Sequence, residues 1–257
     1  MTRIFHRKCM AFIFLSLALI LTGCATTTAN LRPEVPAMHT IAEFSDDYDV
    51  IHAPDPWERF NRSMYRFNYN FDKYIFLPVV TGYEFIAPTF VQTGVTNFFS
   101  NVGEFRTLYN SLFQAKFEKA LVTFGRFATN TTIGIGGLFD PATSFGLEKQ
   151  REDFGQTLGV WGVGAGPYLV LPILGPNTAR SAGGFAVDAG IRMAVMTAID
   201  PFENVDGGDA IEAGIFVLEA IDMRHREKFR YYDSGHPFEY EIVRFISAKR
   251  LELDTMK

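Results

Sequence analysis

The first strong hydrophobic pattern after the N-terminal segment covers residues 55 to 76 and predicts a helix. Apolar side chains recur there at steps of four and three residues: Phe60, Met64, Phe67, Phe71 and Tyr74. This spacing is typical of one helical face. A polar stripe runs beside it: Asn61, Tyr65, Asn68 and Asp72. We expect its asparagines to hydrogen-bond the backbone of a loop or neighbouring helix.

Capping signals predict where this helix begins and ends. Asp55 is expected to be the N-cap residue, with Pro56 at the first helical position and Glu58 closing a capping box. Pro78 is expected to end the pattern, since proline interrupts a helix.

The rest of the pattern predicts a mainly α protein. Helices are expected at residues 89–100, 104–113 and 116–130, after a capping box of Asp209 and Glu212, and from just after Pro237. Alternating strands are scarce. Tyr168–Leu171 is the best candidate for extended chain, and it is short and bracketed by prolines.

The middle of the chain has a different composition. Residues 134–190 hold 13 of the 22 glycines, and residues 154–179 carry no charge. Twenty-six uncharged residues could cross a bilayer, but six glycines and three prolines interrupt them. We therefore expect a broken segment that is buried in protein or lines a cavity, because lipid-exposed irregular backbone is too costly.

The first 24 residues resemble a bacterial lipoprotein signal. A basic start precedes a short apolar run and the lipobox-like sequence Leu21-Thr22-Gly23-Cys24. This predicts a signal peptide at 1–23, lipidation of Cys24, a tether at 24–50 and one domain at 51–257, rather than an uncleaved anchor or an ordinary buried cysteine. Cys9 would be removed, so no disulfide could form. Ala25 resembles the sorting signal for the outer membrane.

Charge and hydrophobicity narrow the function classes. Without residues 1–23 the chain has 21 Lys and Arg against 29 Asp and Glu, a formal charge of −8. This balance argues against nucleic acid, whose affinity for proteins comes chiefly from basic side chains. The 26 phenylalanines need a large core, a membrane or a ligand path.

No motif predicts catalysis. The loops Gly134–Gly137 and Gly162–Gly166 lack the full spacing of a phosphate-binding loop, so close backbone packing is expected. The run Asp233–His236 does not resemble a catalytic triad with a nucleophile elbow. The four histidines beyond the signal segment lack metal-binding spacing: His39, His52, His225 and His236. We expect no metal, no cofactor and no enzyme activity.

Three acidic residues of the middle region could form structural salt bridges: Asp140, Asp153 and Asp188. Their candidate partners are Arg126, Arg151 and Arg180.

The string as a whole resembles the MlaA (VacJ) family of outer-membrane lipoproteins. The resemblance rests on 55–62, 67–72, 95–101, 126–130 and above all the block 152–176, EDFGQTLGVWGVGAGPYLVLPILGP. It covers about residues 55 to 245. One departure is Arg180-Ser181, where the family is expected to have an Arg-Asp pair.

The resemblance implies a ring or horseshoe of amphipathic helices embedded in the periplasmic leaflet of the outer membrane. Its central amphipathic passage would take phospholipid mislocalised in the outer leaflet and pass it to a periplasmic lipid-binding carrier (MlaC-like). The ring would sit beside a trimeric outer-membrane porin. Two other functions stay open: a periplasmic phospholipid hydrolase and a purely structural porin-associated lipoprotein.

Two groups of residues are the candidates for this role. The lipid passage is expected to include Phe154, Gly155, Gly159, Trp161, Gly164, Gly166 and Tyr168. Trp161 and Tyr168 are expected near the membrane interface, which suits aromatic rings with one polar atom. The gate or its support is expected to include Asn61, Phe67, Asn68, Asp72, Arg126, Asn130 and Asp153.

Overall fold

The computed structural model describes residues 55–256, which belong to one compact unit. The predicted signal peptide, the lipidation site Cys24, the tether, His39 and His52 lie outside the described residues, so they stay predictions.

The described part of the chain is mainly helical, as the sequence predicts. The elements are α2 (Glu58–Phe71), η3 (Asp72–Phe76), α3 (Leu77–Ile86), α4 (Thr89–Phe113), α5 (Phe117–Thr132), α6 (Pro141–Ser144), α7 (Phe154–Val160), β1 (Tyr168–Leu171), β2 (Gly175–Thr178), α8 (Ala179–Ile199), α9 (Gly208–Arg226) and α10 (Glu239–Met256). The helix expected at 116–130 is α5, and the one expected after Pro237 is α10.

The predicted ends of the first helix are wrong. Its N-cap residue is Trp57, and no side chain caps it. Asp55 instead accepts hydrogen bonds from Asn61 and from the hydroxyl of Tyr240 on α10, so a tertiary contact takes the place of the local cap. Pro78 does not stop the helix. The π-helix η3 shifts the hydrogen-bond pattern just before this residue, which has no N–H, and α3 continues the chain.

Two other boundaries differ from the prediction. The separate helices expected at 89–100 and 104–113 are the single 25-residue helix α4, because Gly103 is tolerated inside it. Helix α9 begins where predicted but has Gly207 as its N-cap residue, at a positive φ of 79°, and no side-chain cap. The capping box of Asp209 and Glu212 is therefore wrong.

The uncharged segment 154–179 is broken, as expected. It contains the short helix α7, turns, and an antiparallel hairpin in which β1 pairs with β2 from Tyr168↔Thr178 to Leu171↔Gly175. Helix α8 follows directly, and Thr178 and Ser181 form a capping box at its start. Ser181, which departs from the expected family Arg-Asp pair, thus has a local structural role here.

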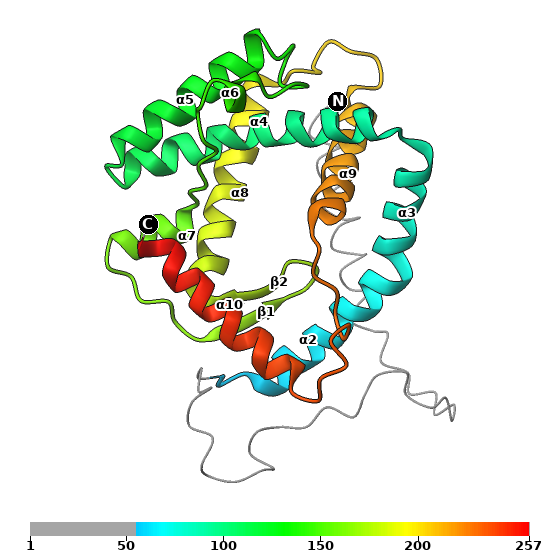
Figure 1. The fold of residues 1–257 in the computed structure, drawn as a ribbon, viewed down its shortest axis with the longest axis vertical. Coiled ribbons are helices and arrows are strands. Elements are labelled where there is room, and N and C mark those ends of the chain that lie inside the picture. The colour runs from blue at the N-terminus through cyan, green and yellow to red at the C-terminus, as the bar shows by residue number, and fades with distance from the viewer. Residues whose placement is uncertain (1–54, 257) are drawn as a thin grey trace. The chain divides into compact units, whose positions relative to one another are not determined.

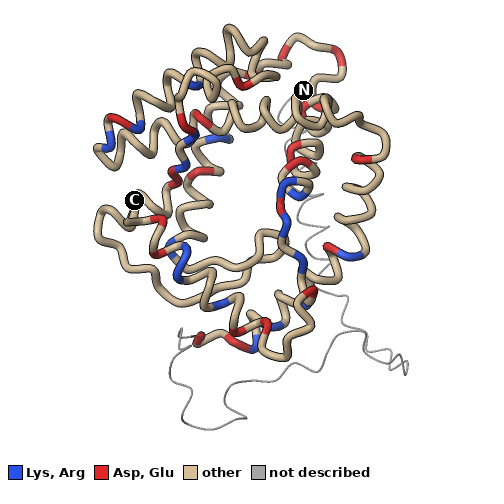
Figure 2. Tube along the Cα trace, viewed as in Figure 1, with Lys and Arg blue, Asp and Glu red and all other residues tan. Residues whose placement is uncertain are grey.

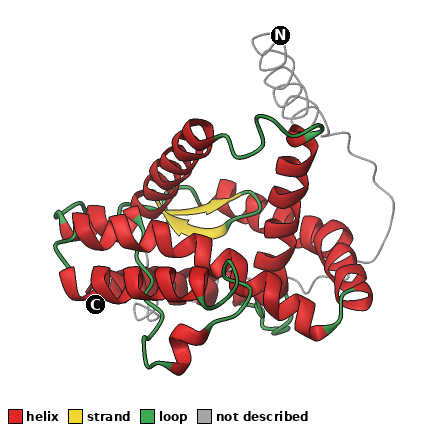
Figure 3. Cartoon of the chain, turned by 90° about the horizontal axis from the view of Figure 1, so that it is seen from above, coloured by secondary structure: helices red, strands yellow, loops and turns green. Residues whose placement is uncertain are grey.

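Within the unit the elements follow one another around a closed circuit (Figure 1). From α2 the chain passes through α3 to α4; α4 contacts α7, α7 packs on α8, and α8 reaches the hairpin, which returns to α2. Helix α9 packs on α3 and α4, α5 lies along α4, and α10 packs on α7 and β2. Figure 3 shows the small hairpin surrounded by helices. The predicted ring-like arrangement of helices is confirmed.

A small aromatic core joins α2, the hairpin and α10. Its buried members are Tyr65, Tyr168, Val170 and Tyr240. The ring of Tyr65 makes edge contacts with Tyr231, Tyr232 and Tyr240, at centroid distances of 4.9, 5.3 and 5.7 Å. Its hydroxyl donates a 2.8 Å hydrogen bond to Glu239, which satisfies the polar end of a buried ring.

Candidate functional site

Helix α2 buries polar side chains most deeply. Asn61, Tyr65 and Asn68 are at most 2% exposed. On its apolar stripe Phe60 is 48% exposed, whereas Met64, Phe67 and Phe71 are half-buried. An ordinary water-soluble helix buries its apolar face most deeply. The polarity of α2 is therefore inverted in part.

The same inversion recurs on other helices. On α4 the buried residues are mostly polar: Phe99, Asn101, Glu104, Thr107, Asn110 and Ser111. Large apolar side chains of α3, α4 and α5 are exposed: Phe85, Ile86, Phe90, Phe105, Phe113, Phe117, Leu121 and Phe124. Patches of this extent mark contact with a membrane or a partner.

Helix α8 carries this surface furthest. It is long and apolar enough to cross a membrane by length and composition, and only 11% of its most hydrophobic 18-residue window is buried. In Figure 2 most of α3, α4 and α8 is free of charge, while α10 and the adjoining part of α2 carry many charges. Charged residues are also frequent along α9, so charge is sparse on α3, α4 and α8 and is spread over the other parts of the circuit.

Two buried asparagines of α2 hold the hairpin. Asn61 donates to the carbonyl of Tyr168 at 3.0 Å and accepts from the amide of Val170 at 2.8 Å. About two helical turns further on, Asn68 donates to the carbonyl of Leu171 at 2.9 Å and accepts from the amide of Ile173 at 2.7 Å. Both asparagines bond backbone groups, as expected, but these belong to strand β1 and the turn after it instead of a loop or a neighbouring helix.

Asp72 connects the π-helix to α9. Its carboxylate accepts two hydrogen bonds from Arg224, at 2.5 and 2.7 Å. Arg224 also donates to the backbone of Phe229 beyond α9. The apolar Phe67 stacks on Phe71 at a centroid distance of 6.0 Å and makes no contact of this polar kind among the described interactions.

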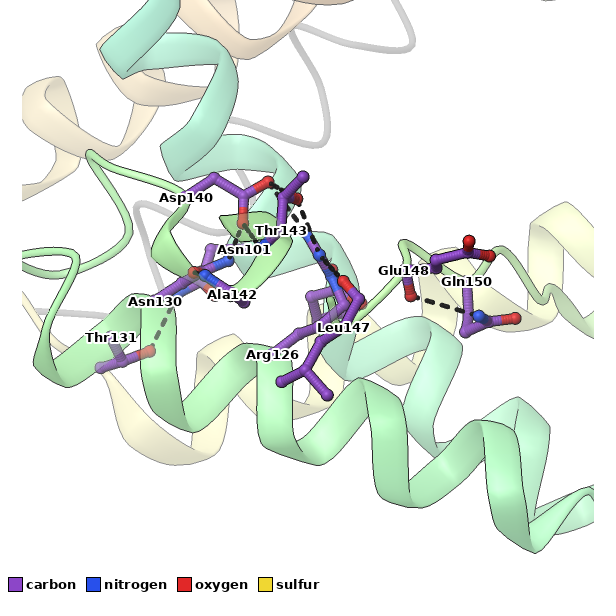
Figure 4. A network of polar contacts seen from close by, with 11 residues as sticks. Asn101, Arg126, Asn130, Thr131, Asp140, Ala142, Thr143, Leu147, Glu148 and Gln150 are labelled. Carbon is purple, nitrogen blue, oxygen red and sulfur yellow. Dashed lines mark hydrogen bonds and ion pairs between the residues drawn. The ribbon is translucent and has the colours of Figure 1, made fainter. Parts of the chain in front are cut away.

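Arg126 is the centre of a buried polar network between α4, α5 and α6 (Figure 4). Its Nε donates to Glu104 at 2.8 Å and its Nη2 to Asp140 at 3.0 Å. Asn130 donates to Asp140 at 3.0 Å and accepts from the amide of Ala142 at 3.1 Å. Of the three acidic residues weighed as salt-bridge partners, Asp140 alone forms such a pair, with Arg126.

Burial and charge shift the pKa values in this network in opposite directions. Burial raises the pKa of Glu104, although Arg126 partly offsets this effect. Partial burial opposes ionisation of Asp140 as well, but hydrogen bonds from Thr143, Arg126 and Asn130 together lower its pKa to about 2. The network therefore holds a fixed charge pair inside the protein.

Asp153 and Asp188 position α7 instead of pairing with Arg151 or Arg180. Asp153 caps α7 by accepting from the amide of Gln156 at 2.8 Å. Asp188 of α8 accepts from the amide of Phe154 at 3.0 Å and from the hydroxyl of Tyr109 at 2.5 Å. These bonds tie α4, α7 and α8 together.

The residues expected to line a passage fall into separate groups. Gly155 and Gly159 are packing positions. A Cβ added at Gly155 would lie 2.9 Å from the Cα of Ser181, and one at Gly159 would lie 2.4 Å from the methyl group of Thr255. Tyr168 is 3% exposed within the aromatic core, and Asn61 holds its backbone inside the unit. Tyr168 also contributes to the wall of the cavity described below.

The other candidates are more open. Trp161 is 55% exposed, donates to the carbonyl of Phe113 at 3.1 Å and contacts the ring of Phe154 at 5.7 Å. A Cβ at Gly164 would meet nothing within 4 Å, and Gly166 has a φ of +70° that favours glycine. The accessible part of the segment is therefore the turn from Trp161 to Gly166.

A cavity of about 420 Å³ lies beside this turn. Its wall includes Gly166, Arg180, Phe245, Lys249 and Glu252. Arg180 donates to the carbonyl of Val163 at 2.9 Å and to Thr255 at 2.7 Å, and Lys249 pairs with Glu252 at 2.8 Å.

The serine and histidines weighed as catalytic or metal-binding residues have other partners in the described part of the chain. No group of three or more metal-binding side chains occurs within residues 55–256. Ser234 donates to Glu239 and His225 lies 2.7 Å from Glu84, while the ring of His236 accepts from the amide of Phe238. Close backbone packing is present at Gly134, where a Cβ would lie 2.4 Å from two carbonyl oxygens. The same expectation is wrong at Gly162 and Gly164, where a Cβ would meet nothing within 4 Å.

The family model described as MlaA lipoprotein matches residues 53–253. The chain belongs to the MlaA lipoprotein family. A solved structure described as "Structural basis for maintenance of bacterial outer membrane lipid asymmetry" has a TM-score of 0.63 and 32% identity to this chain. It covers 79% of this chain, and the match includes 100% of that chain.

Curated relatives support the family. The "Intermembrane phospholipid transport system lipoprotein MlaA" of Haemophilus influenzae is 36% identical over 176 residues, 67% of this chain and 63% of that protein. The protein of that name in Escherichia coli is 41% identical over 138 residues, which are 52% of this chain and 55% of that protein. An uncharacterized protein of Rickettsia prowazekii is 45% identical over 126 residues, and the chain spans 50% of its length.

Several residues with defined contacts have no signal in the sequence. Glu104, Glu239 and Arg224 are buried or nearly buried partners of predicted residues. Their separation from those partners, up to 174 residues, leaves no local signal. For Glu104 the surrounding stripe of buried polar positions on α4 could have been a clue, since its spacing is helical.

Proposed function

We propose that this protein is an outer-membrane lipoprotein that transports phospholipid and thereby maintains the lipid asymmetry of that membrane. The observation that carries the proposal is the inverted polarity of the helices: buried asparagines and ion pairs inside, exposed phenylalanines outside. Membership of the MlaA lipoprotein family and the names of the relatives support the same function.

The exposed apolar surface suits an outer face in lipid. Ring helices with apolar outer faces could lie in the periplasmic leaflet, held there by acyl chains on Cys24. Each buried CH₂ of such a chain contributes about 0.8 kcal/mol to membrane binding. The buried polar networks at Asn61, Asn68 and Arg126 would fix the positions of the helices without relying on a hydrophobic core.

The passage would follow the glycine-rich turn. The amides of Trp161, Gly162 and Val163 donate to carbonyls of α7, so the amides of Gly164 to Gly166 are those that would meet a headgroup crossing the apolar ring. We propose that phospholipid from the outer leaflet moves through this region to a periplasmic lipid-binding carrier, with a trimeric porin beside the ring. No covalent step, metal or cofactor is part of this function.

A clean deletion tests the proposal. Phospholipid in the outer leaflet is measured by adding a phospholipase to intact cells, together with sensitivity to detergent. Both should rise in the deletion strain and return when the gene is restored. Unchanged lipid asymmetry would contradict the proposal.

Two further measurements separate the other candidate functions. A phospholipid hydrolase would release fatty acid or lysolipid when the purified protein is incubated with phospholipid vesicles, and we expect no release. A purely structural lipoprotein would co-purify with a porin, yet folded variants in the turn Trp161–Gly166 would keep normal lipid asymmetry; we expect such variants to lose it.

A further inference from the structure

An ion pair joins two helices that lie on opposite sides of the circuit. Arg192 of α8 donates from Nη1 to Glu219 Oε1 at 2.7 Å and from Nη2 to Oε2 at 2.5 Å, so both oxygens of the α9 carboxylate are engaged. Figure 1 shows α8 and α9 on opposite sides of the central gap between the ribbons. Residues 200–207 already join the two helices at one end, so the pair is a second connection between them, made further along both helices.

The other contacts of the two helices show this separation. Helix α8 packs on α7 and the hairpin, and Asp188 ties it to Tyr109 of α4. Helix α9 packs on α3 and α4, with Asp222 bonded to Thr96 at 2.5 Å. Removal of the pair therefore leaves each helix anchored to its own neighbours.

The surroundings of the pair suit a phospholipid. Both helices expose large apolar side chains near it in sequence: Met193 on α8 and Phe216, Val217 and Met223 on α9. The Arg192 side chain is 49% exposed, whereas that of Glu219 is 14% exposed. The guanidinium is therefore accessible to a ligand while it is held by the carboxylate.

The geometry of the pair indicates which ligand group would fit. The planar guanidinium fork matches carboxylate and phosphate oxygens equally well in bidentate contact. Glu219 thus occupies the place that two phosphate oxygens would take. Because the Arg192 side chain is half exposed, a phosphate that offers the same two oxygens can approach the guanidinium and exchange with the carboxylate.

We propose that Arg192 binds the phosphate of a phospholipid in transit and that Glu219 keeps this site closed until the phosphate displaces it. This inference rests on the proposed function and adds a specific residue and ligand group to it. The acyl chains would lie along the apolar surfaces of α8 and α9, and the connection between the two helices would open while lipid is bound.

Photocrosslinking tests this site. Full-length protein with a photoreactive residue in place of Met193 is placed in vesicles of phosphatidylethanolamine and phosphatidylglycerol, and captured phospholipid is measured by mass. Glu219→Gln should increase capture about fivefold or more, because the competing carboxylate is removed from the guanidinium. Arg192→Gln should reduce capture to background, and Arg192→Lys should give an intermediate level because the fork is lost.

The controls separate a lipid site from a structural tie. Arg250→Gln, in an exposed pair with Asp254 on α10, should leave capture unchanged. The exchanged pair Arg192→Glu with Glu219→Arg keeps the connection but moves the cation to α9, so capture at position 193 should fall. Wild-type capture in that exchange, or in both single Gln variants, would overturn the inference. Thermal melting of each variant confirms that it is folded.

Two further outcomes are distinguishable. If excess inorganic phosphate abolishes capture, the site recognises phosphate without the acyl chains, and a lipid-specific site is overturned. If the deletion strain loses lipid asymmetry but the Arg192→Gln strain retains it, the inference fails while the proposed function stands. Unchanged asymmetry in the deletion strain contradicts the proposed function itself.

Discussion

The guanidinium of Arg126 and the carboxylate of Glu104 form an ion pair of 2.8 Å in which the side chains are only 2% and 1% exposed. In most soluble proteins charged side chains are almost never buried to this degree unless paired. Here the pair joins α4 to α5, and Asp140 adds a second acidic partner from the start of α6. Buried polar contacts of this kind take the structural role that apolar packing usually has.

Replacing Arg126 by leucine should strongly destabilise the fold. The change leaves Glu104 buried without its partner, and breaking a buried pair in this way costs about 3–5 kcal/mol. Chemical denaturation of the purified protein in detergent measures the effect. The control Arg250→Leu removes an exposed pair on α10 and should change the free energy of unfolding by less than about 0.5 kcal/mol. Equal losses in the two variants would contradict the role of the network.

Asp140 should make the protein sensitive to acid. Its pKa in the folded state is lowered to about 2, so its ionised form stabilises the fold. That contribution is complete above about pH 4, near the pKa of an unfolded aspartate, and is lost as the pH falls towards 2. The stability difference between the wild type and Asp140→Asn should therefore shrink over this interval. A difference that is constant from pH 6 to pH 2 would rule out this linkage.

Asn68→Leu should loosen the hairpin without unfolding the protein. The carbonyl of Leu171 and the amide of Ile173 would lose their partner, at a cost of about 1–3 kcal/mol for each buried group left unpaired. Hydrogen exchange at the Ile173 amide should become faster, and lipid traffic should become leaky or misdirected. A wild-type lipid distribution in this mutant would show that Asn68 has a packing role only and does not control lipid traffic.

Two adjacent glycines on α8 give a matched test of helix packing. A Cβ at Gly184 would lie 2.1 Å from the backbone nitrogen of Gly155 on α7, whereas one at Gly183 would meet nothing within 4 Å. Gly184→Ala should therefore separate α7 from α8. It should lower the free energy of unfolding by at least about 2 kcal/mol, and the melting temperature should fall with it. Gly183→Ala should be neutral or stabilising by about 0.5–1 kcal/mol, the helix preference for alanine. Similar melting temperatures would contradict the close contact.

Helical periodicity predicted most of the helices, because the repeat of apolar and polar residues is the same whichever face of a helix is buried. The stripe of Asn61, Tyr65 and Asn68 was visible in the sequence, and its hydrogen bonds to backbone groups were predicted. Which stripe is buried could not be decided from the pattern alone, since either face of α2 could meet a core or a membrane.

The errors have local causes. Asp55 looks like an N-cap residue, but its carboxylate accepts a hydrogen bond from the hydroxyl of Tyr240, which is 185 residues away in sequence. Pro78 looks like a helix end, but the π-helix before it accommodates the missing N–H. At the candidate site, a packing glycine such as Gly155 and an open one such as Gly164 are identical in sequence; only the neighbouring backbone distinguishes them.

Photocrosslinking in intact cells tests the central claim most directly. A photoreactive residue is placed in turn at Trp161, Val163 and Gly164 in the exposed turn, and at the packed positions Gly155 and Thr157 as far as those variants fold. If the protein conducts phospholipid through this region, the turn positions capture phospholipid and the packed positions do not. Absence of phospholipid at every turn position, in a protein that is folded and complements the deletion, would contradict the account.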